Sequence, residues 1–281
     1  MDVGTELNSC IRMERVTYSV GGRRIITDFD MSLGKGANRT ILGVSGVGKT
    51  TILKLLLGLL KPDSGEIYLN GQSIAGLRES QLSRLRRNIA IVFQNGALFD
   101  SMTVGENVGY RLLEEGELPE KEIERIVLEK LSFVGLEKTI NLYPAELSGG
   151  MKKRVAIARA IAADPEYIFF DEPTTGLDPI GIYNIRSLMQ TLQRQGKTTL
   201  MVTHDLHTAF AVSQRFSFLH DTQLIFDGSE EELRTADHPG IREFFSPTEQ
   251  SLFVNDRITN LDPLLHERAV THLARQRPIK H

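Results

Sequence analysis

Apolar runs of strand length alternate with longer amphipathic stretches along most of the chain. Such runs cover 89–93 (IAIVF), 167–170 (YIFF) and 198–203 (TTLMVT), and stretches of helical pattern separate them. Another run at 39–42 leads into a glycine-rich loop, after which a helical pattern covers 50–59. Strands that alternate with helices form mostly parallel sheets, so the pattern predicts an α/β fold.

Three further regions have their own patterns. Residues 12–33 favour short strands around a Gly-Gly turn, and 61–71 favour a short strand between two turns. A charged helix is predicted at 78–87. Residues 96–165 show helical patterns and few strand signals, which predicts a helical subdomain.

The pattern changes after about residue 236, where the sequence DHPG indicates a boundary. We therefore expect a large domain over 1–240 and a C-terminal extension over 241–281. Residues 241–261 show no clear periodicity, but apolar positions recur at helical spacing over about 263–276. An Asp-Pro start precedes them and is typical of a helix N-terminus, so the extension is predicted to carry an amphipathic helix.

Composition and charge narrow the classes of protein. The chain has 281 residues, 41% of them apolar and 25% charged, which is typical of a soluble globular protein. A net charge of −3 argues against binding nucleic acid through a broad basic face. No apolar run approaches the roughly 18 residues that span a bilayer, so service to a membrane would need a partner. The single cysteine, Cys10, and an N-terminus without signal-peptide features favour the cytoplasm.

Residues 43–50 (GVSGVGKT) match the pattern G-x-x-x-x-G-K-[ST] of a phosphate-binding loop. Glycines permit a tight backbone whose N–H groups converge on phosphates, and the following helix adds its positive end. We expect Lys49 to reach the β and γ phosphates of ATP and the Thr50 hydroxyl to bind Mg²⁺. The alternative is chance, which produces this pattern in roughly 1% of chains of this length. The residues predicted to bind nucleotide here are Gly43, Ser45, Gly46, Gly48, Lys49, Thr50 and Thr51.

Two acids follow the apolar run at 167–170. Ligand sites in open α/β sheets lie at the carboxyl edge, where a strand of this kind would end. We expect Asp171 to hold Mg²⁺ and Glu172 to orient or deprotonate the attacking water. The alternative is a solvated acidic turn, which the position after the phosphate loop and the following Pro173 disfavour.

Residues 147–151 (LSGGM) precede a helical stretch and lie between the phosphate loop and the acidic pair. This set resembles the ABC ATPases, whose signature LSGGQ occupies the same place. In that family Ser148 and the amides of Gly149 and Gly150 would hold the γ-phosphate of the other subunit's ATP. The alternative is an ordinary helix cap, since serine and glycine often precede helices.

The resemblance covers roughly residues 10–235. It implies a P-loop NTPase fold with a RecA-like core, an N-terminal antiparallel β subdomain and a helical signature subdomain at about 96–165. It also implies that two copies of the chain, head to tail, form the hydrolytic unit.

The family pattern assigns roles to four further residues. Gln94 resembles the Q-loop glutamine, which senses Mg²⁺ and faces the permease. Asp178 belongs to a sequence that resembles the D-loop, which couples the two sites. His204 resembles the switch histidine at the γ-phosphate, and Tyr18 stands where an aromatic ring stacks on adenine. The alternatives are a polar strand terminus for Gln94 and His204, and packing on the sheet for Tyr18.

Met151 departs from the usual signature glutamine and cannot make the hydrogen bonds of an amide. LSGGM together with 93–108 (FQNGALFDSMTVGENV) is similar to the ATPases of MCE-type lipid transporters, including Mla phospholipid systems. Phe99, Met102 and Val104 are candidates for the groove that receives the permease, and packing within the helical subdomain is the alternative for each.

This likeness implies a peripheral protein on the cytoplasmic face of the inner membrane. Its implied partners are a separate permease, an MCE substrate-binding protein and, in some systems, a small STAS-domain protein. An ATPase for a small-solute importer would have the same site and remains the alternative. A non-transport ABC protein of translation or DNA repair is disfavoured, because such proteins usually carry two ATPase units or a long coiled coil.

The predicted helix at about 263–276 has an apolar stripe, which indicates docking onto its own domain or across the dimer. Its basic end, with Arg275, Arg277 and Lys280, either contacts anionic lipid headgroups or is solvated. We favour docking onto protein.

Overall fold

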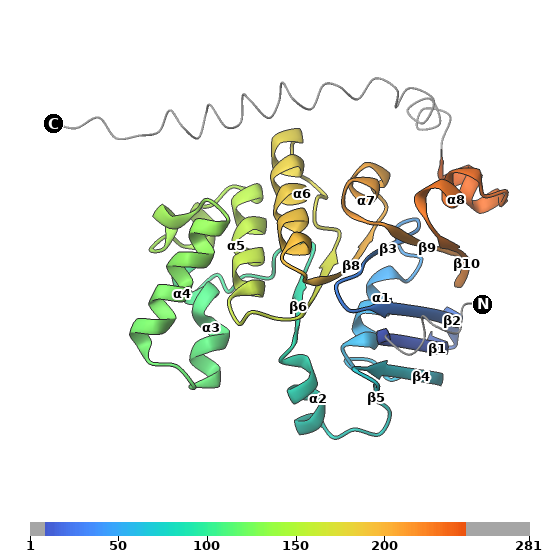
Figure 1. The fold of residues 1–281 in the computed structure, drawn as a ribbon, viewed down its shortest axis with the longest axis horizontal. Helices are drawn as coiled ribbons and strands as arrows, with labels where there is room; N and C mark the ends of the chain where they lie inside the picture. Colours follow the sequence, from blue (N-terminus) through green and yellow to red (C-terminus); the bar gives the residue numbers. More distant parts are fainter. Residues whose placement is uncertain (1–8, 246–281) are drawn as a thin grey trace. The chain divides into compact units, whose positions relative to one another are not determined.

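The computed structural model describes residues 9–245 (Figure 1). The chain divides into two compact units, Met1–Ala236 and Asp237–His281. The described part of the second unit contains the short helix α9 (Pro239–Phe244). The amphipathic helix predicted at about 263–276 lies outside the described residues, and the domain limits near residue 240 stay a prediction.

An antiparallel sheet of four strands has the order β2-β1-β4-β5. Its strands are β1 (Ser9–Val20), β2 (Arg23–Gly34), β4 (Ser64–Leu69) and β5 (Gln72–Ser73). The first two have 12 residues each and are longer than the short strands predicted within 12–33. Register shifts, such as the one between Met13 and Val16, interrupt the apolar alternation without ending the pairing.

A second sheet of six strands has the order β10-β9-β3-β8-β7-β6. Its strands are β3 (Asn38–Leu42), β6 (Ile89–Val92), β7 (Tyr167–Asp171), β8 (Thr198–Thr203), β9 (Arg215–His220) and β10 (Gln223–Gly228). All pair in parallel except β10, which runs antiparallel to β9. Every residue of β7 and β8 is buried, as expected of strands covered on both faces. The predicted parallel sheet is confirmed, and the carboxyl ends of its parallel strands share one edge.

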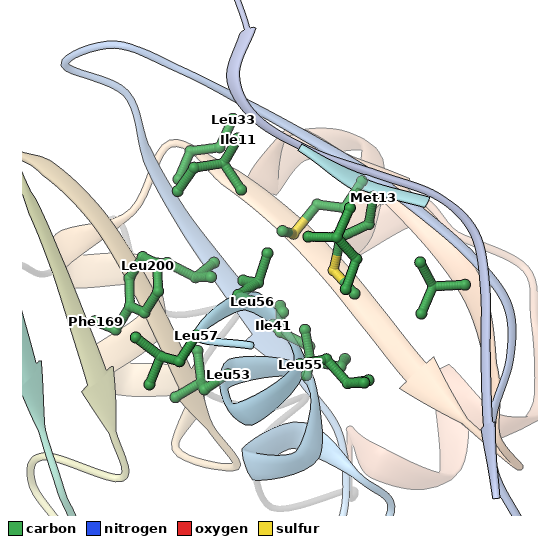
Figure 2. Close-up of a cluster of buried hydrophobic side chains, with 14 of the residues drawn as sticks. Ile11, Met13, Leu33, Ile41, Leu53, Leu55, Leu56, Leu57, Phe169 and Leu200 are labelled. Carbon is green, nitrogen blue, oxygen red and sulfur yellow. The ribbon is translucent and has the colours of Figure 1, made fainter. Parts of the chain in front are cut away.

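Helix α1 (Lys49–Leu56) is anchored in the apolar core that joins the two sheets. Its leucines belong to one buried cluster with Ile11 and Met13 of β1 and with Phe169 of β7 (Figure 2). Full burial of a leucine contributes roughly 1.5–3 kcal/mol, so this cluster fixes α1 and the loop that precedes it. The helix predicted at 50–59 ends earlier, at Leu56, where the chain turns.

The chain between β6 and β7 is helical, as predicted. It forms α3 (Val104–Glu115), α4 (Glu120–Phe133), α5 (Gly149–Ile161) and two 3₁₀ turns, Glu137–Thr139 and Pro144–Glu146. Helices α3, α4 and α5 contact one another, and α5 lies beside α6 (Figure 1). The other helices of the first unit are α2 (Glu79–Arg86), α6 (Pro179–Arg194), α7 (Leu206–Val212) and α8 (Glu230–Thr235).

Candidate nucleotide and catalytic site

The phosphate loop connects the carboxyl end of β3 to the start of α1. Two of its glycines are required by close approach. A Cβ on Gly43 (φ 154°) would lie 2.5 Å from the Leu219 carbonyl oxygen, and one on Gly48 (φ 115°) would lie 2.9 Å from Ile26 Cδ1. No side chain caps α1, so the N–H groups of its first turn are suited to bind phosphate oxygens.

Lys49 joins this loop to the end of β7. Its Nζ donates to the carbonyl oxygens of Gly43 (2.7 Å) and Val44 (3.1 Å) and lies 3.4 Å from Glu172 Oε1. Burial lowers the pKa of Lys49, and the charge of Glu172 acts against that shift. The ammonium therefore lies at the loop with a carboxylate beside it, where a phosphate chain would provide further negative charge.

Thr50 and Asp171 form a second pair at the same edge of the sheet. The Thr50 hydroxyl donates to Asp171 Oδ1 (3.0 Å) and Oδ2 (3.1 Å). Burial raises the pKa of Asp171, while the Thr50 hydrogen bond acts in the opposite direction. A hydroxyl and a carboxylate side by side suit Mg²⁺, which proteins hold through one or two carboxylates together with substrate phosphates. Within residues 9–245 no group of three or more His, Cys, Asp and Glu residues forms a metal site alone.

Glu172 makes several polar contacts within the site. Its Oε1 lies 3.0 Å from His204 Nδ1, and its Oε2 accepts from the hydroxyls of Thr203 (2.9 Å) and Thr175 (3.2 Å). Burial acts to raise the pKa of Glu172, but the hydrogen bond with His204 and the charge of Lys49 outweigh it, so the pKa lies below its ordinary value. An ionised carboxylate at the end of β7 is able to accept a proton or orient a water molecule.

The signature residues form the start of α5, away from the phosphate loop. Ser148 caps this helix by accepting a hydrogen bond from the Met151 amide (3.3 Å), as the helix-cap alternative stated. A hollow of about 440 Å³ is lined by the signature and by the residues after β7. Its lining includes Ser148, Gly149, Gly150, Gly176, Leu177 and Asp178. The signature and the predicted D-loop therefore form one surface, and the phosphate loop is not part of it.

Asp178 also has a local structural role. Its carboxylate accepts from the Gly181 amide (2.6 Å) and caps α6. Gln94 lies two residues after the end of β6 and is exposed. Because β6 pairs in parallel with β7, Gln94 lies at the same edge of the sheet as Asp171 and Glu172.

Two other predicted residues have more ordinary surroundings. Tyr18 lies opposite Ile26 in the β1–β2 pair and packs against the buried core, which is the alternative stated for it. Val104 is fully buried at the start of α3, so its assignment to a surface groove is wrong. Val104 is the first residue of α3, and α3 packs on α5. The apolar pattern of the sequence did not show whether this valine lies inside the subdomain or on its surface. Phe99 does reach the surface, with 42% exposure.

The structure adds two residues that the motifs did not single out. Asp205 accepts from the Thr174 hydroxyl (3.3 Å) and from the Thr208 amide (3.2 Å), directly after His204. Lys153 donates to three carbonyl oxygens around the end of β7. The sequence signal for Lys153 was the basic run after the signature, but three successive basic residues did not reveal which one is buried.

Among residues 9–245, every helix is too short or too polar to cross a membrane. Over residues 26–175 the sequence matches the family model described as ABC transporter.

Described proteins are similar to this chain over a longer part of the sequence than the family model. A Haemophilus influenzae protein described as the intermembrane phospholipid transport system ATP-binding protein MlaF is 41% identical over 224 residues, which cover 79% of this chain and 85% of that protein. A Mycobacterium tuberculosis protein described as a probable ribonucleotide transport ATP-binding protein, mkl, is 37% identical over 244 residues, covering 86% and 68%.

Among solved structures, the fold is similar to a dimeric post-hydrolysis state of the ATP-binding cassette MJ0796 bound to ADP and Pi. The TM-score is 0.72 with 33% identity, over 78% of this chain and 98% of that one.

Proposed function

The chain belongs to the ABC transporter family as an ATP-binding, ATP-hydrolysing subunit, and we propose that its hydrolysis powers phospholipid transport through a separate membrane permease. The observation that carries the proposal is the set of contacts around Glu172. One carboxylate there meets the phosphate-loop lysine, Lys49, and the histidine after β8, His204. The phospholipid cargo is supported by the LSGGM signature and by the likeness to a phospholipid transport ATPase over most of both chains.

ATP binds with its phosphates on the loop at 43–50. Backbone amides and the start of α1 contact the phosphate oxygens, and Lys49 turns its ammonium from the loop carbonyls toward the β and γ phosphates. Thr50 and Asp171, with Gln94 at the same sheet edge, would hold Mg²⁺. When bound, the ion neutralises phosphate charge as the γ-phosphate is transferred. Tyr18 stacks on the adenine.

Glu172 orients and deprotonates the water that attacks the γ-phosphate. Its low pKa keeps it ionised at neutral pH, and its hydrogen bonds to Thr203 and Thr175 fix the direction of the carboxylate. His204, exposed on one side and bonded to Glu172 on the other, holds the γ-phosphate.

Two copies of the chain complete each site. The phosphate loop and the signature hollow lie in separate places on one chain, so a single copy presents two half-sites. In a head-to-tail dimer, Ser148, Gly149 and Gly150 of one copy meet the ATP held by the other, and Asp178 couples the two sites. ATP favours the closed dimer and ADP the open one because the two nucleotides contact the signature differently.

The dimer works as a peripheral assembly at the cytoplasmic face of the inner membrane. Its partners are an integral permease, an MCE substrate-binding protein and a STAS-domain protein, with no nucleic acid. The exposed Phe99 ring, supported by Tyr110 at 4.8 Å between centroids, contacts the permease. A small-solute importer is the second candidate, since one relative is described as a probable ribonucleotide transport protein.

Affinity capture from detergent-solubilised membranes tests this function. The bait is the full chain carrying Glu172→Gln with ATP, and mass spectrometry identifies proteins and lipids. A permease with an MCE protein and enriched phospholipid is expected. The matched control is Lys49→Ala, which weakens ATP binding and captures less of the MCE complex.

Two other results would contradict parts of the proposal. A permease with a soluble solute-binding protein would assign a polar cargo and leave the ATPase intact. Capture of no membrane protein with either bait would remove the transport role.

A further inference from the structure

Lys153 is a buried lysine that the assigned roles do not use. It lies in α5, in the turn after the signature, and is 7% exposed. A buried ammonium is costly unless its donors are satisfied. In the described part of the chain its hydrogen-bond partners are backbone carbonyls rather than carboxylates.

Those carbonyls belong to one short segment. Lys153 Nζ donates to the carbonyl oxygens of Glu172 (3.4 Å), Pro173 (3.0 Å) and Thr175 (2.6 Å). A lysine has three N–H donors, so this segment takes all of them. The segment begins at the proposed catalytic carboxylate and ends directly before Gly176, where the predicted D-loop starts.

The backbone of this segment needs support from outside. Glu172 has φ 48°, in the left-handed region that residues other than glycine rarely adopt. Such strain persists only where surrounding contacts over-determine the conformation. The Glu172 amide donates to the Val202 carbonyl oxygen (2.9 Å), and the Glu172 carbonyl oxygen accepts from Lys153. The strand β8 therefore binds the amide of this strained residue, and the signature helix α5 binds its carbonyl oxygen.

Through its first turn, helix α5 also approaches the chain just beyond this segment. A Cβ on Gly150 would lie 3.8 Å from Leu177 Cδ2, and both residues line the signature hollow. The start of the helix thus carries the residues proposed to meet the partner's ATP. One turn later, Lys153 of the same helix contacts the catalytic segment of its own chain.

We propose that Lys153 is a positioning residue that fixes the backbone of Glu172, Pro173 and Thr175 to the signature helix. The direction of the Glu172 carboxylate then depends on the position of α5. When the signature at the start of α5 binds the partner's ATP, the position of the helix also sets the catalytic geometry of its own chain. This inference rests on the proposed role of Glu172 in hydrolysis.

Steady-state ATPase kinetics of the full-length chain test it with four variants. Lys153→Met removes the donors and keeps an unbranched side chain, and Lys153→Arg keeps charge and donors. Lys152→Met removes the same charge at the neighbouring position, and Glu172→Gln removes the proposed base. ATP binding and thermal unfolding are measured for each variant.

We expect Lys153→Met to lower kcat on the order of 100-fold with KM for ATP and ATP affinity unchanged, since misplacement rather than lost binding is the defect. Lys153→Arg should recover much of kcat, and Lys152→Met should match the wild type. If Lys153→Met does not fold, Lys153→Gln replaces it. Its shorter side chain cannot serve all three carbonyls, and kcat is expected to fall less steeply.

A wild-type kcat in Lys153→Met overturns the inference. So does an equal loss in Lys152→Met, a fall in ATP affinity that parallels kcat, or an arginine variant no faster than the methionine variant. Glu172→Gln separates the proposed role of Glu172 from that of Lys153. Normal turnover in Glu172→Gln would refute the catalytic role of Glu172, whereas a slow Glu172→Gln beside a normal Lys153→Met would refute only the role of Lys153.

Discussion

At the end of β7, two neighbouring carboxyl groups have pKa values shifted in opposite directions. Burial acts to raise both, and it prevails at Asp171, whose main hydrogen bond comes from the neutral hydroxyl of Thr50. At Glu172 the contacts with His204 and Lys49 outweigh burial and lower the pKa. Environments that separate two carboxyl pKa values also separate their roles. Asp171 is suited to bind a cation, and Glu172 to act as an ionised base.

The replacement Glu172→Gln is expected to abolish most turnover and preserve ATP binding. The amide keeps the size of the side chain but cannot accept a proton, and loss of general-base catalysis typically costs about 10²–10⁴-fold. Phosphate release at saturating ATP and an ATP titration measure the two properties. Near-wild-type phosphate release would contradict the assignment.

The replacement Asp171→Asn is expected to raise the melting temperature of the chain at neutral pH without nucleotide by a few degrees. The folded pKa of Asp171 is raised, so the stability that this group contributes is present below its unfolded pKa, near 3.8, and is lost as pH rises through the folded value. A neutral amide avoids that loss. At pH 3 the difference between variant and wild type should vanish.

Magnesium provides the control for this replacement. The wild type should gain more thermal stability from ATP with Mg²⁺ than from ATP with EDTA, because the ion compensates the buried carboxylate. Asp171→Asn should lose that magnesium-dependent gain. An equal gain in both proteins would show that Asp171 does not bind the ion.

At the scale of elements, the segment before α3 is held by one buried amide. Asn107 is fully buried, accepts from the Phe99 amide (2.8 Å) and donates to the carbonyl oxygens of Phe99 (3.0 Å), Met102 (3.1 Å) and Thr103 (2.9 Å). Thr103 and Glu106 form a capping box that starts α3. The loop that presents Phe99 is therefore fixed by its own helix before any permease binds.

The replacement Asn107→Ala is expected to lower the free energy of unfolding by about 1–3 kcal/mol, because it leaves buried backbone groups without partners. Urea unfolding measures it. Phe99→Ala is the matched control, since it removes an exposed ring from the same loop and should reduce permease capture with little change in unfolding. Permease capture that survives Phe99→Ala would place the contact elsewhere.

At the scale of the whole molecule, the two half-sites that we propose would make dimerisation part of catalysis. The hollow that Ser148 and Asp178 line does not by itself form an ATP site, because the phosphate loop is not among its lining residues. Family membership and the likeness to a dimeric cassette support the same conclusion. Turnover should therefore rise more steeply than linearly with protein concentration where the dimer is weak.

Truncation after Phe245 removes most of the predicted C-terminal extension (241–281), including the helix predicted at about 263–276, and tests its predicted role. If residues 246–281 dock onto protein, their loss should weaken the ATP-bound dimer of the Glu172→Gln chain and lower turnover in the otherwise native chain. Light scattering with ATP measures the first effect and phosphate release the second. Unchanged dimer and unchanged turnover would leave the docking idea without support.

Local motifs were readable from the sequence because each one encodes its own geometry. A phosphate loop needs glycines where a Cβ would collide, as at Gly43, and a lysine six residues later whose side chain returns to it. The apolar run at 167–170, followed by Asp171, predicted both a buried strand and the position of that strand's end at the carboxyl edge of the sheet. The parallel sheet, the helical stretch and the family resemblance followed from such segments.

Only the tertiary structure decided which residues meet across long stretches of chain. Thr203 and His204 contact Glu172 because β8 pairs beside β7, and Lys153 rather than Lys152 is buried because α5 packs with one face toward that strand end. Val104 is fully buried and Tyr18 is partly buried against the core for the same reason. Burial and long-range hydrogen bonds depend on how sheets and helices pack together, and the residues nearby in sequence do not contain that information.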